Sequence, residues 1–366
     1  MSRFWNQRTN SLKPYVPGEQ PGDGQKVIKL NTNECPYPPS PAVREALAGF
    51  AGGDFSSLRL YPNADGLAAR QAFARRAGLE TTQVFAGNGS DEVLAIAFQT
   101  FFGNGAPLWI PQISYSFYPV YCQLYGIENR VIPMKPDLSI DLEAFLKTDA
   151  PCGGVVLANP NAPTTLALTL EQIEQLLQAH QDCVVLVDEA YVDFGGESAL
   201  ALIPKYENLL VVQTLSKSRA LAGMRVGFAA GSKELIEGMD RVKNSFNSYP
   251  LDRIAIACAA ASLEDESYFC QTVEKIVATR QRTAENLEKM GFTVLDSKAN
   301  FLFVSHPNFR ADMLFHALKQ RGILVRYFNQ PQIDNYLRIS IGTDAEMAAL
   351  CFALEKILET EGQKPE

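Results

Sequence analysis

Residues 214–228 read TLSKSRALAGMRVGF and follow the apolar run NLLVVQ. The apolar run predicts a buried β-strand, so Lys217 lies just beyond a strand end, at the rim of a core. Gly223 and Gly227 would permit a tight return of the chain that brings Arg225 back beside Lys217. A lysine in this position is either a side chain that extends its amine to solvent or a nucleophile. The segment alone does not decide between the two.

Short apolar runs alternate with helical patterns on the N-terminal side of this segment. The runs around residues 154–158 and 184–187 are apolar throughout, and residues 169–180 between them have the pattern of an amphipathic helix. Uninterrupted apolar runs are typical of parallel strands that are covered on both faces. The sequence therefore predicts an α/β fold with a three-layer α/β/α large domain around a mostly parallel sheet.

Changes in composition and in hydrophobic pattern divide the sequence into three parts. Residues 1–29 are rich in Pro, Gly, Gln and Asn and are expected to form an N-terminal arm. Residues 30–245 carry the strand and helix alternation of the large domain. Residues 246–366 combine long helical patterns with a few strands such as ANFLFVS and LRISIG, which indicates a smaller α+β C-terminal domain.

Composition excludes several classes of protein. The chain has 366 residues and a net charge of −8, which argues against nucleic acid or an anionic membrane as the main partner. It has no signal-peptide pattern and no apolar run long enough to span a membrane. The seven cysteines are scattered and never spaced as CxxC, as expected for reduced thiols in the cytoplasm, and no histidine has a second ligand at helical spacing. We therefore expect a soluble cytoplasmic enzyme without a metal site.

Polar residues follow each predicted strand of the large domain, at the edge where ligands of α/β sheets bind. GNGSDE at residues 87–92 fits an anion-binding turn into a helix, although it also fits an ordinary capped helix. Asp188 follows four apolar residues, where a carboxylate either receives a buried cation or caps a neighbouring helix. Together with Tyr191, Lys217 and Arg225, these groups are the set needed to hold pyridoxal phosphate.

The sequence resembles the fold-type I pyridoxal-phosphate enzymes and, among them, the histidinol-phosphate aminotransferase family. DEAY together with SKxxxLAGxRxG is the most specific marker, and the resemblance covers nearly the whole chain. The segments that carry it are LNTNECPYPPSP, RLYPN, GNGSDEV, PQISYSFYPVY, NPNAPT, VVLVDEAYVDF, TLSKSRALAGMRVGF, ANFLF, RGILVR and LRISIGT.

The resemblance implies a role for each residue at the cofactor, pyridoxal 5'-phosphate. Lys217 would bind it through a Schiff base and later move the proton of the substrate. Asp188 would keep the ring nitrogen protonated, Tyr191 would hydrogen-bond the ring O3′, and Tyr115 would stack on the ring. The phosphate would be bound by residues at two strand exits, namely Ser90, Asp91, Thr214, Ser216 and Arg225. Tyr61 would reach the phosphate from a neighbouring subunit, which implies a homodimer.

The resemblance also implies how the substrate is held. Arg338 in LRIS would receive the substrate carboxylate, and Arg326 in ILVRYF would bind the phosphate of histidinol phosphate. Tyr15 and Asn33 would line the same end of the site. From the residues alone, each arginine could instead form a surface ion pair on a strand.

Two segments depart from the usual pattern of the family. NPNAPTT replaces the usual NPNNPTG, so that Ala162 stands where an asparagine contacts O3′ and Thr165 stands where a glycine follows. Asn161 is the residue that would take over the O3′ contact. NECPYPPSP replaces the commoner NENPYGPSP and places Cys35 near the substrate entrance.

The expected activity is the transfer of an amino group between L-histidinol phosphate and 2-oxoglutarate, a step of histidine biosynthesis. Aromatic amino-acid aminotransferases and threonine-phosphate decarboxylases share the same motifs, and the fold does not choose among them. A third hypothesis is a non-catalytic ligand-sensing domain fused to a DNA-binding module. Such a protein should carry a basic N-terminal helix-turn-helix, for which residues 1–29 leave too little room.

Overall fold

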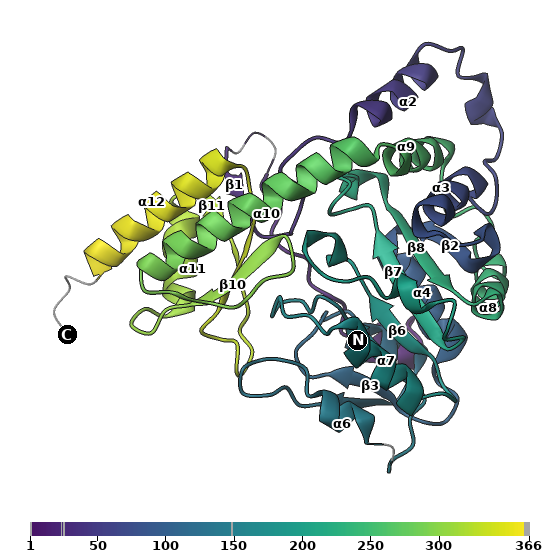
Figure 1. Cartoon of the computed structure of the whole chain (residues 1–366), viewed down its shortest axis with the longest axis horizontal. Helices are drawn as coiled ribbons and strands as arrows, with labels where there is room; N and C mark the ends of the chain where they lie inside the picture. Colours follow the sequence, from purple (N-terminus) through teal and green to yellow (C-terminus); the bar gives the residue numbers. More distant parts are fainter. Residues whose placement is uncertain (1, 23, 25, 148, 362–366) are drawn as a thin grey trace.

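A seven-stranded sheet forms the centre of the computed structural model, which describes residues 2–22, 24, 26–147 and 149–361 (Figure 1). The strand order is β2-β8-β7-β6-β5-β3-β4. Strand β8 is antiparallel to both neighbours and the remaining pairs are parallel, which confirms the mostly parallel sheet. The strands are β2 (Val84–Asn88), β3 (Leu108–Pro111), β4 (Asn129–Ile132), β5 (Gly154–Ala158), β6 (Val185–Asp188), β7 (Leu209–Thr214) and β8 (Val226–Gly231).

Helices cover both faces of this sheet, because successive residues of its strands point into two different cores. In β5, Val155 and Leu157 pack into one core, whereas Val156 and Ala158 pack into the other. The first core is closed by α3 (Leu67–Ala77), α6 (Leu142–Leu146), α7 (Leu170–Ala179) and α9 (Arg253–Glu264). The second core is closed by α4 (Gly89–Phe101), α5 (Tyr118–Tyr125) and α8 (Lys233–Asn244). The three layers confirm the predicted fold class.

Strand β8 is the element of this sheet that the sequence did not predict. Its residues, VGFAAG, include two glycines and two alanines, which are poor strand formers. The small residues are needed where the strand passes the start of α4. A Cβ atom on Gly227 would lie 2.5 Å from the backbone nitrogen of Ser90, so only glycine permits this approach.

A second, smaller sheet lies beside the C-terminal helices, with the strand order β12-β13-β10-β9 and antiparallel pairing throughout. Its strands are β9 (Thr293–Val294), β10 (Phe301–Ser305), β12 (Arg326–Tyr327) and β13 (Leu337–Ser340). The helices around it are α10 (Glu266–Lys289), α11 (Ala311–Gln320) and α12 (Asp344–Glu361), which group together on one side of the molecule in Figure 1.

Two contacts bear on where the two units meet. Strand β1 (Ile28–Lys29) pairs in parallel with β11 (Ile323–Leu324), so the chain touches the C-terminal unit before it builds the large sheet. Helix α9 packs against α3 and α2 (Pro41–Ala51) of the large unit. We therefore propose that the C-terminal unit begins at α10 and that it also includes β1.

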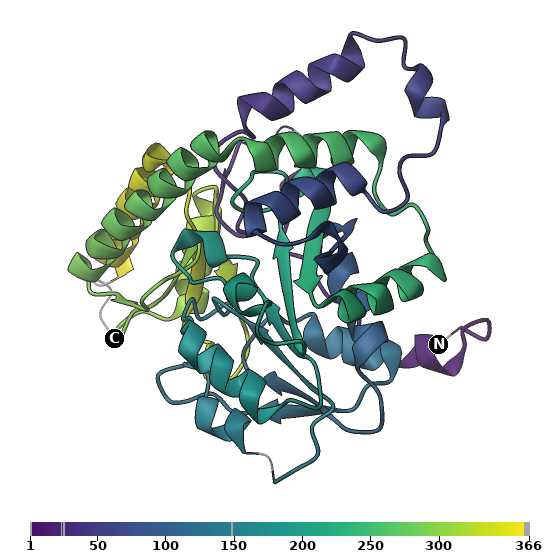
Figure 2. The ribbon, with the colours of Figure 1, turned by 45° about the vertical axis from the view of Figure 1, so that its right-hand side comes forward.

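The remaining elements are short. Helix α1 (Gln7–Ser11) belongs to the N-terminal arm. Within the described residues, short 3-10 helices lie in connections: η1 (Ser56–Arg59), η2 (Thr81–Gln83), η3 (Val192–Phe194), η4 (Ala199–Leu202) and η5 (Ala222–Met224). Figure 2 shows α2 and the segment that contains η1 projecting away from the body of the molecule.

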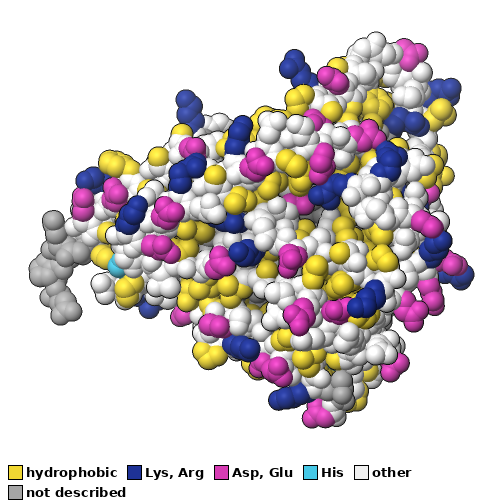
Figure 3. Space-filling view, viewed as in Figure 1, with side chains coloured by type: hydrophobic (Ala, Val, Ile, Leu, Met, Phe, Trp, Pro, Cys, Tyr) yellow, Lys and Arg dark blue, Asp and Glu magenta, His cyan; other side chains and the backbone are white. Residues whose placement is uncertain are grey.

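The surface carries both signs of charge. On the face that Figure 3 shows, acidic and basic side chains are interspersed, without a large field of one sign. Among the described residues, no helix combines the length and the apolar character that crossing a bilayer requires.

Candidate active site

A cavity of about 250 Å³ opens at the carboxyl ends of β5, β6 and β7, between the large sheet and the C-terminal unit. All of the site residues predicted from the sequence line this cavity except Asn161 and Tyr61. Strand β6 contributes Asp188, and the segment after β7 contributes Lys217. The N-terminus of α4 and the end of the small sheet close the other sides.

Lys217 extends into this cavity from the segment after β7. Its side chain is partly buried, and its Nζ donates a hydrogen bond to the backbone carbonyl of Thr32 over 3.1 Å. Nζ also lies 5.9 Å from the centre of the Tyr191 ring. The amine therefore has one weak backbone partner and a free approach to the cavity, which is what a nucleophilic amine requires.

Asp188 ends β6 and is 4% exposed. The hydroxyl of Tyr118 donates to its Oδ2 over 2.8 Å, whereas its Oδ1 is buried and has no hydrogen-bond partner among the residues that the structure describes. Burial raises the pKa of Asp188 to about 6, although the hydrogen bond from Tyr118 acts in the opposite direction. A buried carboxylate oxygen without a partner is costly, so Oδ1 is suited to receive a positively charged N–H group.

Tyr191 is held by a residue that the sequence assigned to substrate binding. The Asn33 side chain donates from Nδ2 to the Tyr191 hydroxyl over 3.0 Å. Asn33 is fixed in turn by Ser340, whose hydroxyl donates to Asn33 Oδ1 over 2.9 Å. Asn33 has a φ of 57°, a left-handed conformation that asparagine tolerates better than most residues. Because Asn33 donates to the oxygen of the Tyr191 hydroxyl, the hydrogen of that hydroxyl remains free to donate to another group.

The N-terminus of α4 faces the cavity without a side-chain cap. Asn88 occupies the N-cap position but makes no capping hydrogen bond, and Gly89 follows with a φ of 79°. A side chain at residue 89 would collide with the guanidinium of Arg225, which lies directly over this turn. The backbone N–H groups of the first turn and a guanidinium therefore converge on one point, an arrangement that binds phosphate.

The hydroxyls of Thr214 and Ser216 complete this anion site. Thr214 Oγ1 and Ser216 Oγ are 3.0 Å apart, and both side chains are buried at the exit of β7. Arg225 Nη2 also lies 3.1 Å from Asp91 Oδ2, an ion pair that positions the guanidinium while both groups stay partly exposed. The hydroxyl of Tyr115 donates to the other oxygen of Asp91 over 2.9 Å.

The N-terminal arm forms one wall of the cavity. Tyr15 stacks on Phe117 with 4.7 Å between ring centres, and both rings lie near Tyr115. The backbone nitrogen of Lys13 donates to the side chain of Gln123 on α5 over 2.9 Å. The arm is thus attached to α5 and presents Tyr15 to the cavity.

Arg326 and Arg338 are paired residues of the antiparallel strands β12 and β13. Arg338 Nη2 donates to the carbonyl of Asn31 over 2.9 Å, but its Nε is buried without a partner. Within the described residues, neither arginine forms an ion pair with a carboxylate of the chain. Burial, and to a lesser degree the neighbouring charge of Arg326, lowers the pKa of Arg338. Two unpaired guanidinium groups in a cavity favour an anionic ligand.

Asn161 and Tyr61 lie outside this cavity. The Asn161 amide donates to the carbonyl of Ile113 and to the Thr164 hydroxyl, each over 2.9 Å, and its Oδ1 accepts from Ser114 over 2.8 Å. Its hydrogen-bonding groups are therefore used within the protein, so we do not retain Asn161 as a substitute for the O3′ asparagine. Ala162 lines the cavity at that position. Tyr61 is 79% exposed and stacks on Tyr249 at 4.6 Å.

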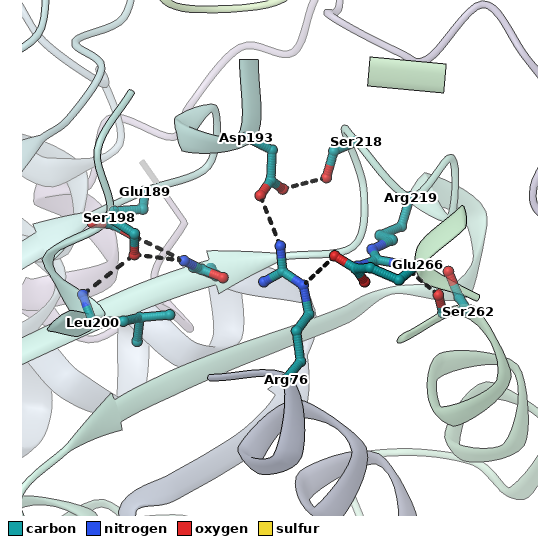
Figure 4. Close-up of polar contacts among 10 residues, drawn as sticks. Arg76, Glu189, Asp193, Ser198, Leu200, Ser218, Arg219, Ser262 and Glu266 are labelled. Atoms are coloured by element: carbon teal, nitrogen blue, oxygen red, sulfur yellow. Dashed lines mark hydrogen bonds and ion pairs between the residues drawn. The ribbon is translucent and has the colours of Figure 1, made fainter. Parts of the chain in front are cut away.

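A polar network ties the residues after Lys217 to the rest of the protein (Figure 4). The Ser218 hydroxyl donates to Asp193 over 2.5 Å, and Arg76 of α3 lies 3.2 Å from the other oxygen of Asp193. Arg76 and Arg219 both reach Glu266 at the start of α10, at 3.5 and 2.7 Å. The network joins the lysine segment to α3 and to the first turn of the C-terminal unit.

Sequence reasoning missed two partners of the central residues. Tyr118 stands three positions after Tyr115 in SYSFYPVY, and the need of a buried Asp188 for a donor could have drawn attention to it. Thr32 contacts Lys217 through its backbone carbonyl, for which no side-chain pattern exists.

Comparison with known proteins places this geometry in context. The sequence profile of the family described as aminotransferase class I and II matches residues 25–354. Histidinol-phosphate aminotransferase 2 of Dechloromonas aromatica (strain RCB) is 54% identical over 357 residues, which cover 98% of this chain and 99% of that protein. The histidinol-phosphate aminotransferase of Acinetobacter baumannii (strain SDF) is 51% identical over 354 residues, 97% of either chain. The crystal structure of histidinol-phosphate aminotransferase from Sinorhizobium meliloti in complex with pyridoxal-5'-phosphate superposes with a TM-score of 0.86 at 26% identity, over 98% of this chain and 99% of that one.

Proposed function

The chain belongs to the class I and II aminotransferase family, and on that premise we propose that it is a histidinol-phosphate aminotransferase. The proposed reaction converts L-histidinol phosphate and 2-oxoglutarate to imidazole-acetol phosphate and L-glutamate, in histidine biosynthesis. Relatives of that name match nearly the full length of the chain at more than half identity. The scattered cysteines of the sequence suit the cytoplasm, where this activity is expected.

The residues of the cavity fit pyridoxal 5'-phosphate. The observation that carries this fit is Asp188 Oδ1, a buried carboxylate oxygen with no partner, in the same cavity as the amine of Lys217. The phosphate would be held by the start of α4 with Ser216 and Arg225. When bound, this cofactor supplies an electron-withdrawing ring that stabilises negative charge at the α-carbon of the substrate.

Each residue of the cavity would have a separate role in the reaction. Lys217 would hold the cofactor through Nζ and would also move a proton from the substrate α-carbon. Asp188 would keep a negative charge beside the ring nitrogen, and Tyr118 orients that carboxylate. Tyr191 would donate to the ring oxygen, and Asn33 fixes its hydroxyl.

The two unpaired arginines account for the proposed substrates. Both substrates of the reaction carry two functions, a reactive amine or ketone and an anionic group at some distance from it. Arg338 and Arg326 lie at the end of the cavity that the small sheet forms, where they offer donors that no carboxylate of the described residues satisfies. Arg338 would receive a carboxylate and Arg326 a phosphate, because a guanidinium binds either group in a bidentate manner.

A comparison of three substrates tests this function. The purified holoenzyme is given glutamate with either imidazole-acetol phosphate or phenylpyruvate, and release of carbon dioxide from threonine phosphate is measured in parallel. We expect kcat/KM for imidazole-acetol phosphate to exceed that for phenylpyruvate by at least about 100-fold, as loss of an anionic contact in a buried site implies. Equal turnover of phenylpyruvate would assign an aromatic aminotransferase, and release of carbon dioxide would assign a decarboxylase.

We also propose that the enzyme is a homodimer in which Tyr61 reaches the cofactor phosphate of the partner. The support is an exposed apolar region on the projecting segment after α2 and on the neighbouring residues before α9. We define this region as the Tyr61 patch: Phe55, Leu58, Leu60, Tyr61, Phe246 and Tyr249. A contiguous patch of this kind on a surface favours a protein interface.

Mixing two defective variants tests the shared site. Lys217→Ala is expected to be inactive, and Tyr61→Ala is expected to bind the cofactor weakly. Random exchange of subunits would make half of the dimers mixed, each with one intact site, so activity should recover to about one quarter of that of the wild type. Failure of the mixture to recover activity, or a monomeric mass by light scattering, would contradict the shared site and leave the assigned reaction untouched.

A further inference from the structure

Three soft metal ligands meet at the edge of the large sheet opposite the active site. Cys152 precedes β5, Cys183 precedes β6, and His180 follows α7. One ligand atom from each of these residues lies within 4.8 Å of the other two, in a search of the described residues. His180 and Cys183 are three positions apart in the sequence, but Cys152 is 31 positions from Cys183, so sequence spacing does not predict the cluster.

The separation of the sulfur atoms fits a single metal ion. Cys152 Sγ and Cys183 Sγ are 3.9 Å apart. Two thiolates that bind one tetrahedral zinc ion at about 2.3 Å lie about 3.8 Å from each other. The two sulfurs are therefore already at the spacing of neighbouring ligands, so metal binding would require little movement of the backbone.

His180 is held in the tautomer that a metal ligand needs. Its Nε2 lies 2.7 Å from the carbonyl of Phe145, and since a carbonyl can only accept, Nε2 carries the hydrogen. The lone pair of the ring is consequently on Nδ1. A ligand histidine almost always donates from its other nitrogen in this way, which fixes the ring and increases its basicity. The side chain is 5% exposed, so the ring cannot turn freely.

A further residue fixes the turn that presents two of the ligands. Asn208 donates from Nδ2 to the carbonyl of His180 over 2.9 Å and to the carbonyl of Cys183 over 3.4 Å. The backbone nitrogen of Cys183 also donates to the His180 carbonyl over 3.3 Å. Both cysteines remain partly exposed, which gives an ion a route of entry.

We propose that Cys152, His180 and Cys183 form a binding site for a thiophilic metal ion, with Zn²⁺ as the ion that the ligand set fits best. Imidazole and thiolate ligands select zinc over magnesium, calcium and manganese. Three protein ligands leave a fourth position for water or for a ligand from another molecule.

A metal ion bound here would link the amino ends of β5 and β6, the two strands whose carboxyl ends reach the active site. Cys183 and Asp188 are five residues apart, nearly all of them in β6, so the two sites are separated by roughly 17 Å at about 3.3 Å per residue. None of the three ligands lines the active-site cavity. The metal is therefore expected to affect stability and to leave the aminotransferase chemistry unchanged.

Zinc binding is tested on the holoenzyme after reduction with a phosphine and removal of metals with a chelator. Zn²⁺ is then titrated in competition with a chromogenic chelator, and Co²⁺ is added to a second sample to record the bands of thiolate-bound tetrahedral cobalt. We expect one tight equivalent per chain, cobalt–thiolate bands and a higher melting temperature with the metal.

Matched variants identify the ligands. Cys152→Ser and Cys183→Ser should each abolish the cobalt–thiolate bands or weaken zinc binding beyond the roughly 10- to 100-fold loss that removal of a supporting hydrogen bond causes. Asn208→Ser should show that smaller loss. Cys270→Ser is the control, since it removes an exposed thiol elsewhere on the surface and should leave binding unchanged. Activity of all four should equal that of the wild type, which shows that each one folds.

Two results would overturn the proposal. The first is zinc affinity of the wild type no higher than that of the Cys152→Ser, Cys183→Ser double variant. The second is a disulfide between Cys152 and Cys183 that forms in the wild type in air, is seen as a loss of two hydrogens by mass spectrometry, and is accompanied by no zinc uptake after reduction.

Discussion

Asp188 and Glu189 are adjacent, fully buried carboxyl groups with opposite surroundings. Glu189 is satisfied, because Ser198, the backbone of Ala199 and Gln213 all donate to it, at 2.6 to 2.8 Å. Figure 4 shows Glu189 beside Ser198. Asp188 has an oxygen with no partner, which faces a cavity. Burial raises the pKa of both carboxyls, to about 7 for Glu189 and about 6 for Asp188. A buried charge with every partner in place stabilises local structure, whereas one that lacks a partner marks a ligand site.

The different roles of the two carboxyl groups are tested by neutralising each one in turn, starting with Asp188. Asp188→Asn should lower kcat by at least about 100-fold, because a positioned charge that stabilises the reaction is removed. The melting temperature of the cofactor-free protein should stay the same or rise, since an unpaired buried carboxylate is lost. Steady-state kinetics and calorimetry measure the two effects, and a large loss of stability with normal kcat would reverse the roles assigned here.

The second prediction compares a buried arginine, Arg219, with the half-buried Arg338. Arg219 is fully engaged by Glu266 and the carbonyl of Ser262, whereas Arg338 has a buried Nε without a partner. Arg338→Lys should lower kcat/KM for glutamate roughly 30-fold, which corresponds to about 2 kcal/mol for a broken charge pair. Unfolding midpoints should change little.

Arg219→Lys is the matched control for that variant. It should lower the denaturation midpoint and leave KM within about 2-fold of the wild type, because Arg219 does not line the cavity. The comparison of Arg219 with Arg338 fails if the two variants change the same quantity.

The third prediction concerns pH. The folded pKa of each carboxyl lies above its unfolded value, so the folded protein binds more protons and stability should fall as pH rises from about 4 to about 7. The part due to Asp188 is on the order of 3 kcal/mol in the cofactor-free protein. Since a cation beside Asp188 favours its charged form, the holoenzyme should lose that part of the slope and keep the part due to Glu189. Urea denaturation across this pH range, with and without cofactor, measures the difference.

The smallest effect is expected at Glu189. Glu189→Gln keeps the shape of the side chain but leaves donors around it without an acceptor, so the free energy of unfolding should fall by about 1–2 kcal/mol. The value of kcat should stay within about 2-fold of the wild type. Denaturation and steady-state kinetics on the same preparation measure the free energy of unfolding and kcat. A loss of kcat as large as that of Asp188→Asn would contradict the distinction between the two carboxyl groups.

The sequence predicted most of the fold because its strands are continuous apolar runs. The runs around residues 154–158 and 209–214 correspond to β5 and β7, and the helical pattern at residues 169–180 corresponds to α7. Strand β8 escaped prediction because close approach to α4 demands small residues, which carry little strand preference. Tertiary proximity overrode local preference there.

The site was predictable where chemistry depends on a side chain at a strand exit, and less so elsewhere. Most of the residues chosen for the site line one cavity because the carboxyl ends of parallel strands meet at one edge. Asn161 was chosen by motif position, yet its amide is taken up by Ile113 and Thr164. The meeting of Cys152 with Cys183 had no local signature, since adjacent strands bring together residues far apart in the sequence.

The contact between Asn33 and Ser340 has a consequence for how the protein is made. Asn33, which holds Tyr191, is itself fixed by Ser340, a residue 307 positions later. On the ribosome, the large sheet can be completed once β8 has emerged, but the side chain of Asn33 lacks its contact with Ser340 until the last strand of the small sheet has been translated. A nascent chain that stops before residue 340 would therefore have its sheet and its lysine while the tyrosine next to them lacked support. The contact that fixes Asn33 beside Tyr191 therefore forms only after Ser340 has been translated, although Asp188, Tyr191 and Lys217 are translated much earlier.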